Sequence, residues 1–377
     1  MKYFLWLLRI VVGVLFIFSG LVKANDPLGL SYKMEEFFEV LHMTFFSHYA
    51  LAFSILMIGF ELMAGVAILL GYAFRLFSFF TLLLIAFFTF LTAFALYSGK
   101  IKECGCFGDC IKISNEATFY KDVALLVMIL ILFVYRKRVQ PLFSNNYIGT
   151  SLMILLTFFS FGMQWYVLEH LPVHDCLPYK VSNNISEKMQ IPAGAIPDKY
   201  ETVMIYEKDG VKKEFTMSNY PWQDSTWKFV DRKDKLISKG NAEAEIKDFA
   251  ISDYQGGDHT KEILTTAGYT FVYFIKDPEH ARTDNMDKLR KLYEMTVRLN
   301  IPFYAVYSCN EKTAKEFHAA QKLGDMPYYV VDVTVSKTAM RSNPGLMLLE
   351  QGTVRGKWSF CDYPKNIAFE NKKLKIN

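Results

Sequence analysis

Long apolar segments follow one another through the first part of the chain, separated by short polar stretches. A helix needs about 20 predominantly apolar residues to cross the hydrocarbon core of a bilayer. Runs of about this length lie at residues 3–22, 49–72, 76–96, 120–135 and 147–168. The fourth run is the shortest, and we expect its helix to begin earlier. The pattern therefore predicts five membrane-spanning helices, because a chain in hydrocarbon must satisfy its backbone polar groups internally.

The first apolar run stands where a secretory signal peptide would stand. It is longer than the apolar core of a signal peptide, which has roughly 7 to 15 residues. No A-x-A cleavage site follows it before Lys23. We therefore expect this run to remain in the protein as the first spanning helix.

Basic residues in the loops predict the orientation of the bundle, because cytoplasmic loops carry an excess of Lys and Arg. The basic residues that flank the apolar runs are Lys2, Arg9, Arg75, Arg136, Lys137 and Arg138. All of them fall on one side if the N-terminus is cytoplasmic. The loops at 23–48 and 97–119 and everything after residue 168 then lie outside. In a bacterium, this prediction corresponds to the inner membrane with a periplasmic C-terminal domain.

Residues 177–377 have mixed charge and scattered Gly and Pro, which is typical of a water-exposed region. Pro and Asn mark a linker at 169–195. Two β-rich segments around a Lys-Asp-Gly turn predict a hairpin at 200–217. Residues 219–245 are polar and carry no pattern that we can assign. We therefore treat 169–245 as a linker region with a β-hairpin.

Strands and helices alternate from residue 246 onwards. Aromatic and β-branched runs predict the strands, and apolar residues at helical spacing predict the helices between them. The predicted strands are 269–276, 301–308, 328–331, 345–350 and 353–358, and the predicted helices are 284–299 and 311–323. This alternation, followed by a hairpin, predicts a mixed α/β sheet over residues 246–377.

The order of these elements resembles a thioredoxin-like domain over about residues 246–365. The resemblance implies that Pro344, just before the last hairpin, is the cis-proline of that fold, since cis bonds occur almost only before proline. Where the family places C-x-x-C, this chain has DPEHAR at 277–282, and Cys309 and Cys361 do not fill the motif. We interpret these two cysteines as structural thiols. The domain is therefore expected to bind a partner rather than to reduce one.

Three of the six cysteines crowd into the segment CGCFGDC, at Cys104, Cys106 and Cys110. Such clustering favours redox chemistry or metal binding over a general disulfide scaffold. Three interpretations stay open: a redox-active pair with a third cysteine, a static disulfide beside a spare thiol, or a metal site. His42 and His48 on the other outer loop are the nearest further ligands for a metal. Cys106 and Cys110, four residues apart, would share a face if the stretch were helical.

Ionisable residues inside the apolar runs are further candidates, because a charge in the middle of a bilayer is costly. Glu61 lies near the middle of the second run. We expect it either to handle protons beside a quinone or thiol site, or to lock helices together. Arg9 would extend toward the cytoplasmic surface or pair with Glu61. Lys121 and Asp122, at the head of the fourth run, are interpreted as an interfacial ion pair.

The first four spans and the cysteine segment resemble DoxX/MauE-like membrane proteins. The resemblance rests on FSG at 18–20 with Lys23, an acidic residue in the second span, and CGCFG at 104–108. MauE-type proteins are implicated in disulfide formation during methylamine dehydrogenase maturation, and DoxD-type relatives are parts of a thiosulfate:quinone oxidoreductase. Over about residues 1–138, the resemblance implies a redox role for the first two clustered cysteines. Cys110 lies beyond the CGCFG core, so the resemblance does not extend to it, and we treat it as a candidate third participant. A quinone is a candidate acceptor.

A net charge of +4, dispersed along the chain, is too weak to indicate nucleic-acid binding. The sequence predicts an all-α membrane bundle at 1–138, a fifth span at 139–168, a linker region at 169–245 and a thioredoxin-like α/β domain at 246–377. Two functions fit this organisation. One is a membrane thiol–disulfide redox protein that exchanges electrons between extracytoplasmic thiols and quinone. The other is a non-enzymatic assembly factor or complex subunit whose soluble domain docks an extracytoplasmic client.

Overall fold

The computed structural model describes residues 2–101, 105–111, 113–197, 199–208, 210–216, 219, 221, 224, 226–238, 240, 242–371 and 373–376. Among them are five helices long and apolar enough to cross a membrane, which confirms the five predicted spans. These are α1 (Lys2–Ala24), α3 (Ala50–Leu70, preceded by η1, Thr44–Tyr49), α4 (Phe74–Ser98), α5 (Asn115–Val134) and α6 (Asn146–Glu169). The fourth span begins ahead of its apolar run because Ser114 caps α5 and accepts a hydrogen bond from the amide of Ala117.

Helices α1 and α3 approach each other closely at two glycines. A Cβ atom on Gly13 would lie 2.9 Å from the Cβ of Leu69, and one on Gly65 would lie 2.8 Å from the backbone nitrogen of Ile17. Small residues let helices pack closely in a membrane, where van der Waals contact rather than the hydrophobic effect holds them together. This contact fixes the position of the ionisable residues farther along both helices.

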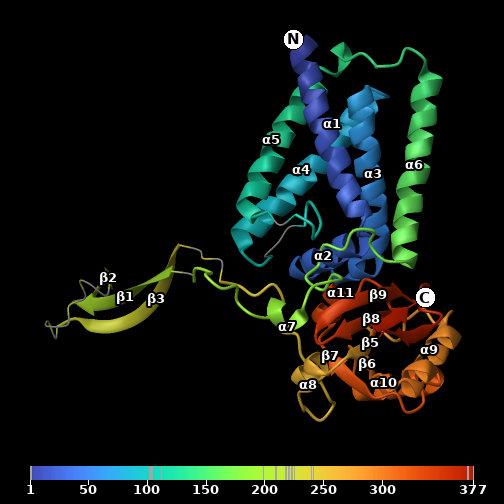
Figure 1. The fold of residues 1–377 in the computed structure, drawn as a ribbon. Coiled ribbons are helices and arrows are strands. Elements are labelled where there is room, and N and C mark those ends of the chain that lie inside the picture. Colours follow the sequence, from blue (N-terminus) through green and yellow to red (C-terminus); the bar gives the residue numbers. More distant parts are fainter. Residues whose placement is uncertain are drawn as a thin grey trace.

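One end of the bundle carries α2 (Pro27–Val40), the cysteine-bearing loop and the region that follows α6 (Figure 1). The other end carries the N-terminus and η2 (Arg136–Arg138). Helix α2 was not predicted from the sequence. Its first residue is Pro27, which directly follows Asp26 in the chain. The side chain of Asp26 caps the helix by accepting a hydrogen bond from the amide of Gly29. The cysteine loop and the C-terminal region therefore share one end, as expected for an odd number of spans.

A three-stranded antiparallel sheet projects away from the rest of the protein (Figure 1). It consists of β1 (Lys199–Lys208), β2 (Val211–Thr216) and β3 (Lys228–Ser238), in the order β2-β1-β3. Strands β1 and β2 are the predicted hairpin, which turns at Gly210 with a φ of 79°. Strand β3 falls in the stretch that was left unassigned. Its exposed, charge-rich sequence lacks the apolar alternation by which strands are recognised.

The remaining region contains a six-stranded sheet in the order β4-β7-β6-β5-β8-β9. Strands β5, β6 and β7 are parallel to one another, whereas β4, β8 and β9 run antiparallel to their neighbours. A short helix, α7 (Ile185–Lys188), precedes the small sheet. The elements after β3 are β4 (Ile251–Ser252), α8 (Thr260–Thr265), β5 (Tyr269–Ile275), α9 (Met286–Arg298), β6 (Phe303–Tyr307), α10 (Glu311–Ala320), β7 (Tyr328–Val331), α11 (Val333–Ala339), β8 (Gly345–Glu350), β9 (Thr353–Ser359), β10 (Ile367–Glu370) and β11 (Lys373–Ile376). The sheet and its helices confirm the predicted α/β character of this region.

Strand β5 lies at the centre of the α/β domain and is buried on both faces. Phe271, Tyr273 and Ile275 belong to one apolar core, together with residues of α9 and α10. Val272 and Phe274 belong to a second core, together with residues of α8 and α11. A strand covered on both faces has a continuous apolar sequence, which explains why this strand was evident from the sequence.

Candidate functional site

The cysteine-bearing loop between α4 and α5 folds back onto α1. Residues 106–110 form successive turns. The hydroxyl of Ser19 donates a hydrogen bond to the carbonyl of Cys106 at 3.0 Å. The buried ring of Phe107 packs against the ring of Phe18, with 5.8 Å between their centroids. The loop is therefore held against the membrane bundle by both polar and aromatic contacts.

Cys110 is joined by a disulfide to Cys176, which follows the fifth span. Cys106 and Cys110 would share a face only in a helix, and residues 106–110 form turns instead. Cys104 lies outside the described residues. Sequence reasoning missed Cys176, although a signal was available. It is the first cysteine after the last span, and an odd number of spans brings it to the same end of the bundle as the cluster.

Glu61 is paired with Lys23 inside the bundle. The Nζ atom of Lys23 lies 3.0 Å and 2.8 Å from the two carboxylate oxygens, and the two side chains are only 3% and 4% exposed. Burying two charges is costly even when they are paired, so the pair marks a special position rather than a source of stability. In the sequence, Lys23 stands out only as the residue after the first apolar run and as part of the family resemblance, and no local pattern points to Glu61 as its partner.

Arg9 does not pair with Glu61. Its guanidinium donates hydrogen bonds to the carbonyls of Ile68, Leu69 and Gln140 at 3.1, 2.9 and 3.1 Å. The first two carbonyls lie in the last turn of α3, where carbonyls lack partners within the helix and carry the negative end of its dipole. Arg9 thus caps α3 and takes no part in the site at the opposite end of the bundle.

Lys121 and Asp122 form the predicted ion pair, with 2.6 Å between Nζ and Oδ1. The pair is less exposed than expected, because the Asp122 side chain is only 1% exposed. Its second oxygen, Oδ2, has no hydrogen-bond partner among the described residues. Lys121 also lies over the ring of Phe107, 5.0 Å from the centroid. A buried carboxylate oxygen without a partner requires an explanation, and proton transfer is one.

The free thiol of Cys106 shares this environment. Burial raises the pKa of the thiol to about 11, and the charge of Asp122 acts in the same direction, whereas Lys121 and Lys23 oppose it. The thiol is therefore protonated at neutral pH. Because the thiolate is the reactive form, Cys106 needs a base before it can react. The buried carboxylate of Asp122 is the candidate base.

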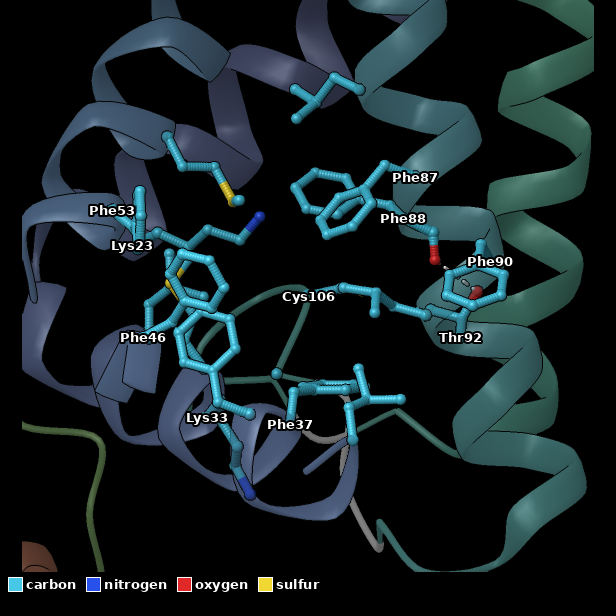
Figure 2. Close-up of a pocket in the computed structure, with 18 of the residues that line it drawn as sticks. Lys23, Lys33, Phe37, Phe46, Phe53, Phe87, Phe88, Phe90, Thr92 and Cys106 are labelled. Atoms are coloured by element: carbon cyan, nitrogen blue, oxygen red, sulfur yellow. Dashed lines mark hydrogen bonds between the residues drawn. The ribbon is translucent and has the colours of Figure 1, made fainter. Parts of the chain in front are cut away.

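An apolar cavity of about 660 Å³ lies against Cys106 and Lys23 (Figure 2). Its walls come from α1, α2, α3, α4 and the cysteine loop. Ligand pockets typically have volumes of roughly 300 to 1,000 Å³. This cavity could not be predicted from the sequence. Most of its lining residues are apolar and come from separate elements, and each resembles an ordinary packing or lipid-facing residue.

The loop that carries Pro344 faces the membrane region. The Asn343–Pro344 peptide bond is cis, as the resemblance implied. In the same loop, the guanidinium of Arg341 pairs with Asp26 at the start of α2 at 2.8 Å and with Asp109 of the cysteine loop at 2.5 Å. Arg341 therefore links the soluble domain directly to the segment between Cys106 and the disulfide.

A second contact joins α2 to the soluble domain beside this loop. The Nζ atom of Lys276, which directly follows β5, donates hydrogen bonds to the hydroxyl of Tyr32 at 3.1 Å and to the carbonyl of Met340 at 3.0 Å. Burial lowers the pKa of Lys276 to about 7. Lys337 pairs with Glu35 of α2 at 2.8 Å. The Pro344 loop and the end of β5 thus pack on the chain's own membrane region.

The metal interpretation of the cysteine cluster gains no support from the part of the chain that the structure describes. In that part, no three His, Cys, Asp or Glu side chains gather where they could hold an ion. His42 and His48 both lie in the connection between α2 and α3.

Residues 1–135 match the model of a protein family described as methylamine utilisation protein MauE, and residues 200–239 match that of a domain of unknown function. No curated protein and no solved structure matches the chain. The first match covers the first four spans and the cysteine loop. The N-terminal part is therefore a MauE-like membrane region, and the family's accessory role in methylamine utilisation supports an accessory role in the membrane here. The second match coincides with the projecting sheet β1–β3.

Proposed function

We propose that this chain is a membrane-embedded thiol–disulfide redox factor. In this proposal it passes electrons from thiols of extracytoplasmic client proteins to a quinone. One observation carries the proposal: a short loop at the end of the bundle presents both an exposed disulfide cysteine, Cys110, and a half-buried free thiol, Cys106, near the buried carboxylate of Asp122. A loop that served only as a staple would not need a free thiol near a buried carboxylate.

The proposed route has three exchanges, each of which moves two electrons and two protons. A client dithiol becomes a disulfide and reduces Cys110–Cys176 to two thiols. These two thiols are reoxidised as they reduce a Cys104–Cys106 disulfide. The resulting dithiol then transfers two electrons and two protons to a quinone, which leaves as the hydroquinone. The free thiol of Cys106 belongs to the reduced form of the second pair.

Asp122 would accept the proton from Cys106 in this route. The thiol is protonated at neutral pH because burial raises its pKa. A carboxylate with one unpartnered oxygen, buried near the thiol, is suited to general-base catalysis. Lys121 would then stabilise the thiolate, as its charge already favours that form.

The soluble domain, in this proposal, is a thioredoxin-like module that lacks its own dithiol. The strand order and the cis peptide before Pro344 support this assignment. Its task would be to hold the cysteine loop and to receive the client near Cys110. The basic loops support a cytoplasmic N-terminus and a periplasmic domain in a bacterial inner membrane.

Thiol trapping in intact cells tests the proposal. After a reductant pulse, Cys110–Cys176 is expected to re-form in the parent chain and to stay reduced in Cys106→Ser, while Cys309→Ser behaves like the parent. Mass spectrometry of alkylated peptides would report each cysteine separately. The proposal fails if Cys104 and Cys106 keep one redox state under both oxidant and reductant and the Cys→Ser variants leave client disulfides intact.

A non-enzymatic assembly factor is the second candidate. It is favoured by the way in which Cys110–Cys176 and Arg341 fasten the soluble domain to the bundle. In that case the disulfide would be a static link and the soluble domain a docking surface. Co-purification distinguishes the two: a stoichiometric partner whose binding survives loss of all the clustered cysteines supports this second candidate.

A further inference from the structure

The cavity beside Cys106 is apolar over nearly all of its lining and polar at one end. Its apolar walls include Leu30, Met34, Phe37, Met57, Phe88 and Leu91. Its polar lining residues are Cys106, Lys23, Lys33 and Thr92. Lys33 pairs with Glu36 at 3.2 Å and its nitrogen points away from the cavity (Figure 2), and the Thr92 hydroxyl donates to carbonyls of its own helix. Cys106 and Lys23 are therefore the polar groups available to a ligand. A ligand that fits it must therefore combine a large hydrocarbon part with a compact polar group.

The cavity opens toward the lipid rather than toward water. Four of its lining residues lie at the surface of α3 and α4, within the spanning segments: Phe53, Leu56, Phe87 and Phe90 are 39%, 60%, 48% and 58% exposed. In a bilayer these side chains would meet acyl chains. A ligand dissolved in the membrane can therefore enter sideways between the two helices, whereas a water-soluble ligand would have to cross the hydrocarbon first.

The polar end offers a hydrogen bond and a reducing group. Figure 2 shows the nitrogen of Lys23 pointing into the cavity, towards the rings of Phe87 and Phe88. An ammonium group has three donors, and in the described structure Glu61 receives two of them. The Nζ atom of Lys23 lies 5.0 Å from the centroid of the Phe88 ring, so the remaining donor and an aromatic ring lie within reach of one ligand headgroup.

We infer that this cavity is the binding site of an isoprenoid quinone. The quinone ring lies between Phe37 and Phe88 with one carbonyl accepting a hydrogen bond from Lys23, and its tail leaves past Leu56 into the bilayer. This inference rests on the proposed function and assigns the place where its electron acceptor binds. A phospholipid fits less well, because a phosphate group requires several donors, whereas Lys23 has one donor left beside Glu61 and Lys33 is paired with Glu36.

Photo-crosslinking of the full chain in nanodiscs of phosphatidylethanolamine and phosphatidylglycerol tests the site. The probe is an azido-substituted ubiquinone with a short isoprenoid tail, and decylubiquinone is the competitor. Crosslinks are expected on α3, α4 or the cysteine loop, and decylubiquinone should suppress them. Crosslinks confined to other surfaces, or crosslinks that decylubiquinone leaves in place, would overturn the inference.

Two variants refine the test. Met57→Trp fills the cavity and should weaken competition by decylubiquinone about tenfold or more, because the pocket loses its free volume. Leu155→Trp adds the same ring on the exposed face of α6, where the parent residue is 66% exposed, and should change nothing. Because Met57→Trp alone can disturb folding, Lys23→Met combined with Glu61→Leu removes the ion pair as a unit and should also weaken binding. Equal competition in the parent and in both cavity variants contradicts the inference.

Cys106→Ser separates this inference from the proposed function. The variant should still bind the quinone probe in the cavity while it no longer reduces decylubiquinone with client thiols. If the parent chain shows crosslinks in the cavity but no thiol-dependent reduction of quinone, the binding site is supported and the proposed function is contradicted. If the parent chain reduces quinone but its crosslinks lie elsewhere, the proposed function is supported and the binding site is contradicted.

Discussion

At the scale of single residues, the site is a half-buried thiol, a buried carboxylate and two ammonium groups placed close together. Cys106 lies near Lys121 and Asp122, which form one ion pair, and near Lys23 of the other. Burying charged groups is costly even when they are paired, and Lys23, Glu61 and Asp122 are all nearly inaccessible. This cost, beside a free thiol, is the reason to treat the groups as chemistry rather than as a structural contact.

Asp122→Asn should separate the electrostatic effect of the carboxylate from its role as a base. Burial is the main reason why the pKa of Cys106 is raised, and the charge of Asp122 adds to it, so its removal should lower the pKa and speed alkylation at pH 8. If Asp122 is also the base, thiol-dependent turnover should fall by about 10²-fold or more. Peptide-resolved alkylation and quinone reduction measure the two quantities. Glu116→Gln, an exposed change on the same helix, is the control, and a variant with unchanged turnover would remove Asp122 from the mechanism.

Alkylation of Cys106 should depend on pH as a thiol with a pKa of about 11 requires. Since only the thiolate reacts, the rate should rise by about tenfold per pH unit from pH 7 to pH 10 and should show no plateau. In the denatured chain the same peptide should reach a plateau above its ordinary pKa of about 8.5. A plateau below pH 9 in the native protein would mean that the thiol is not buried as described.

At the scale of elements, the packing of α1 against α3 brings Lys23 to Glu61. The two helices lie close enough for this pair only because Gly13 and Gly65 leave room at the crossing. Side chains larger than glycine at this position would push the helices apart and shift the Lys23 amine relative to the cavity.

Gly65→Ala should therefore destabilise the bundle. The added Cβ would lie 2.8 Å from the backbone nitrogen of Ile17 and 3.0 Å from the carbonyl of Gly13, so the helices must separate. Overpacking of this kind costs about 1–3 kcal/mol. Gly162→Ala on α6 is the matched control, because a Cβ there has nothing within 4 Å. Unfolding in mixed detergent measures the stability of the two variants. Equal stabilities of Gly65→Ala and Gly162→Ala would contradict the close contact between α1 and α3.

At the scale of the whole molecule, the soluble domain packs on the membrane region through its cis-proline loop. Arg341 reaches both Asp26 at the start of α2 and Asp109 of the cysteine loop. The domain is consequently placed to control access to the disulfide at Cys110. Two further contacts, at Tyr32 and Glu35, lie on the same helix α2.

Arg341→Gln should increase access to the Cys110–Cys176 disulfide, whose Cys110 half is already exposed. The change removes a buried guanidinium and leaves the partly exposed carboxylates of Asp26 and Asp109 without their cation, which weakens the contact between the soluble domain and the cysteine loop. Reduction of Cys110–Cys176 by a water-soluble phosphine should therefore become faster. Arg355→Gln, which loses the solvent-accessible pair with Glu350, should leave that rate unchanged. Identical rates in both variants would show that domain packing does not protect the bond.

Lys276 should make the packed domain more stable as the pH rises from 7 to 9. Burial lowers the pKa of Lys276 from 10.5 to about 7, so in this range the folded state holds fewer protons than the unfolded state. Raising the pH then favours folding, by up to about 1.4 kcal/mol per pH unit for one proton. Lys276→Met should remove this slope, and Lys288→Met on the exposed face of α9 should keep it. Denaturant unfolding at three pH values measures the free energy of unfolding of each chain. A free energy that does not change with pH in the parent chain would contradict the prediction.

The sequence by itself determined the five spans, the hairpin and the α/β elements, because apolar run length and periodicity are local properties of a chain. It also singled out Glu61 and the clustered cysteines, since charge in a span and crowded thiols are visible without coordinates. Only the tertiary structure decided their partners. Lys23 and Glu61 are 38 residues apart, Cys110 and Cys176 are 66 apart, and Arg341 and Asp109 are 232 apart. No local pattern encodes such pairings, because helix packing and the position of the soluble domain create them, and the same is true of the cavity that their elements enclose.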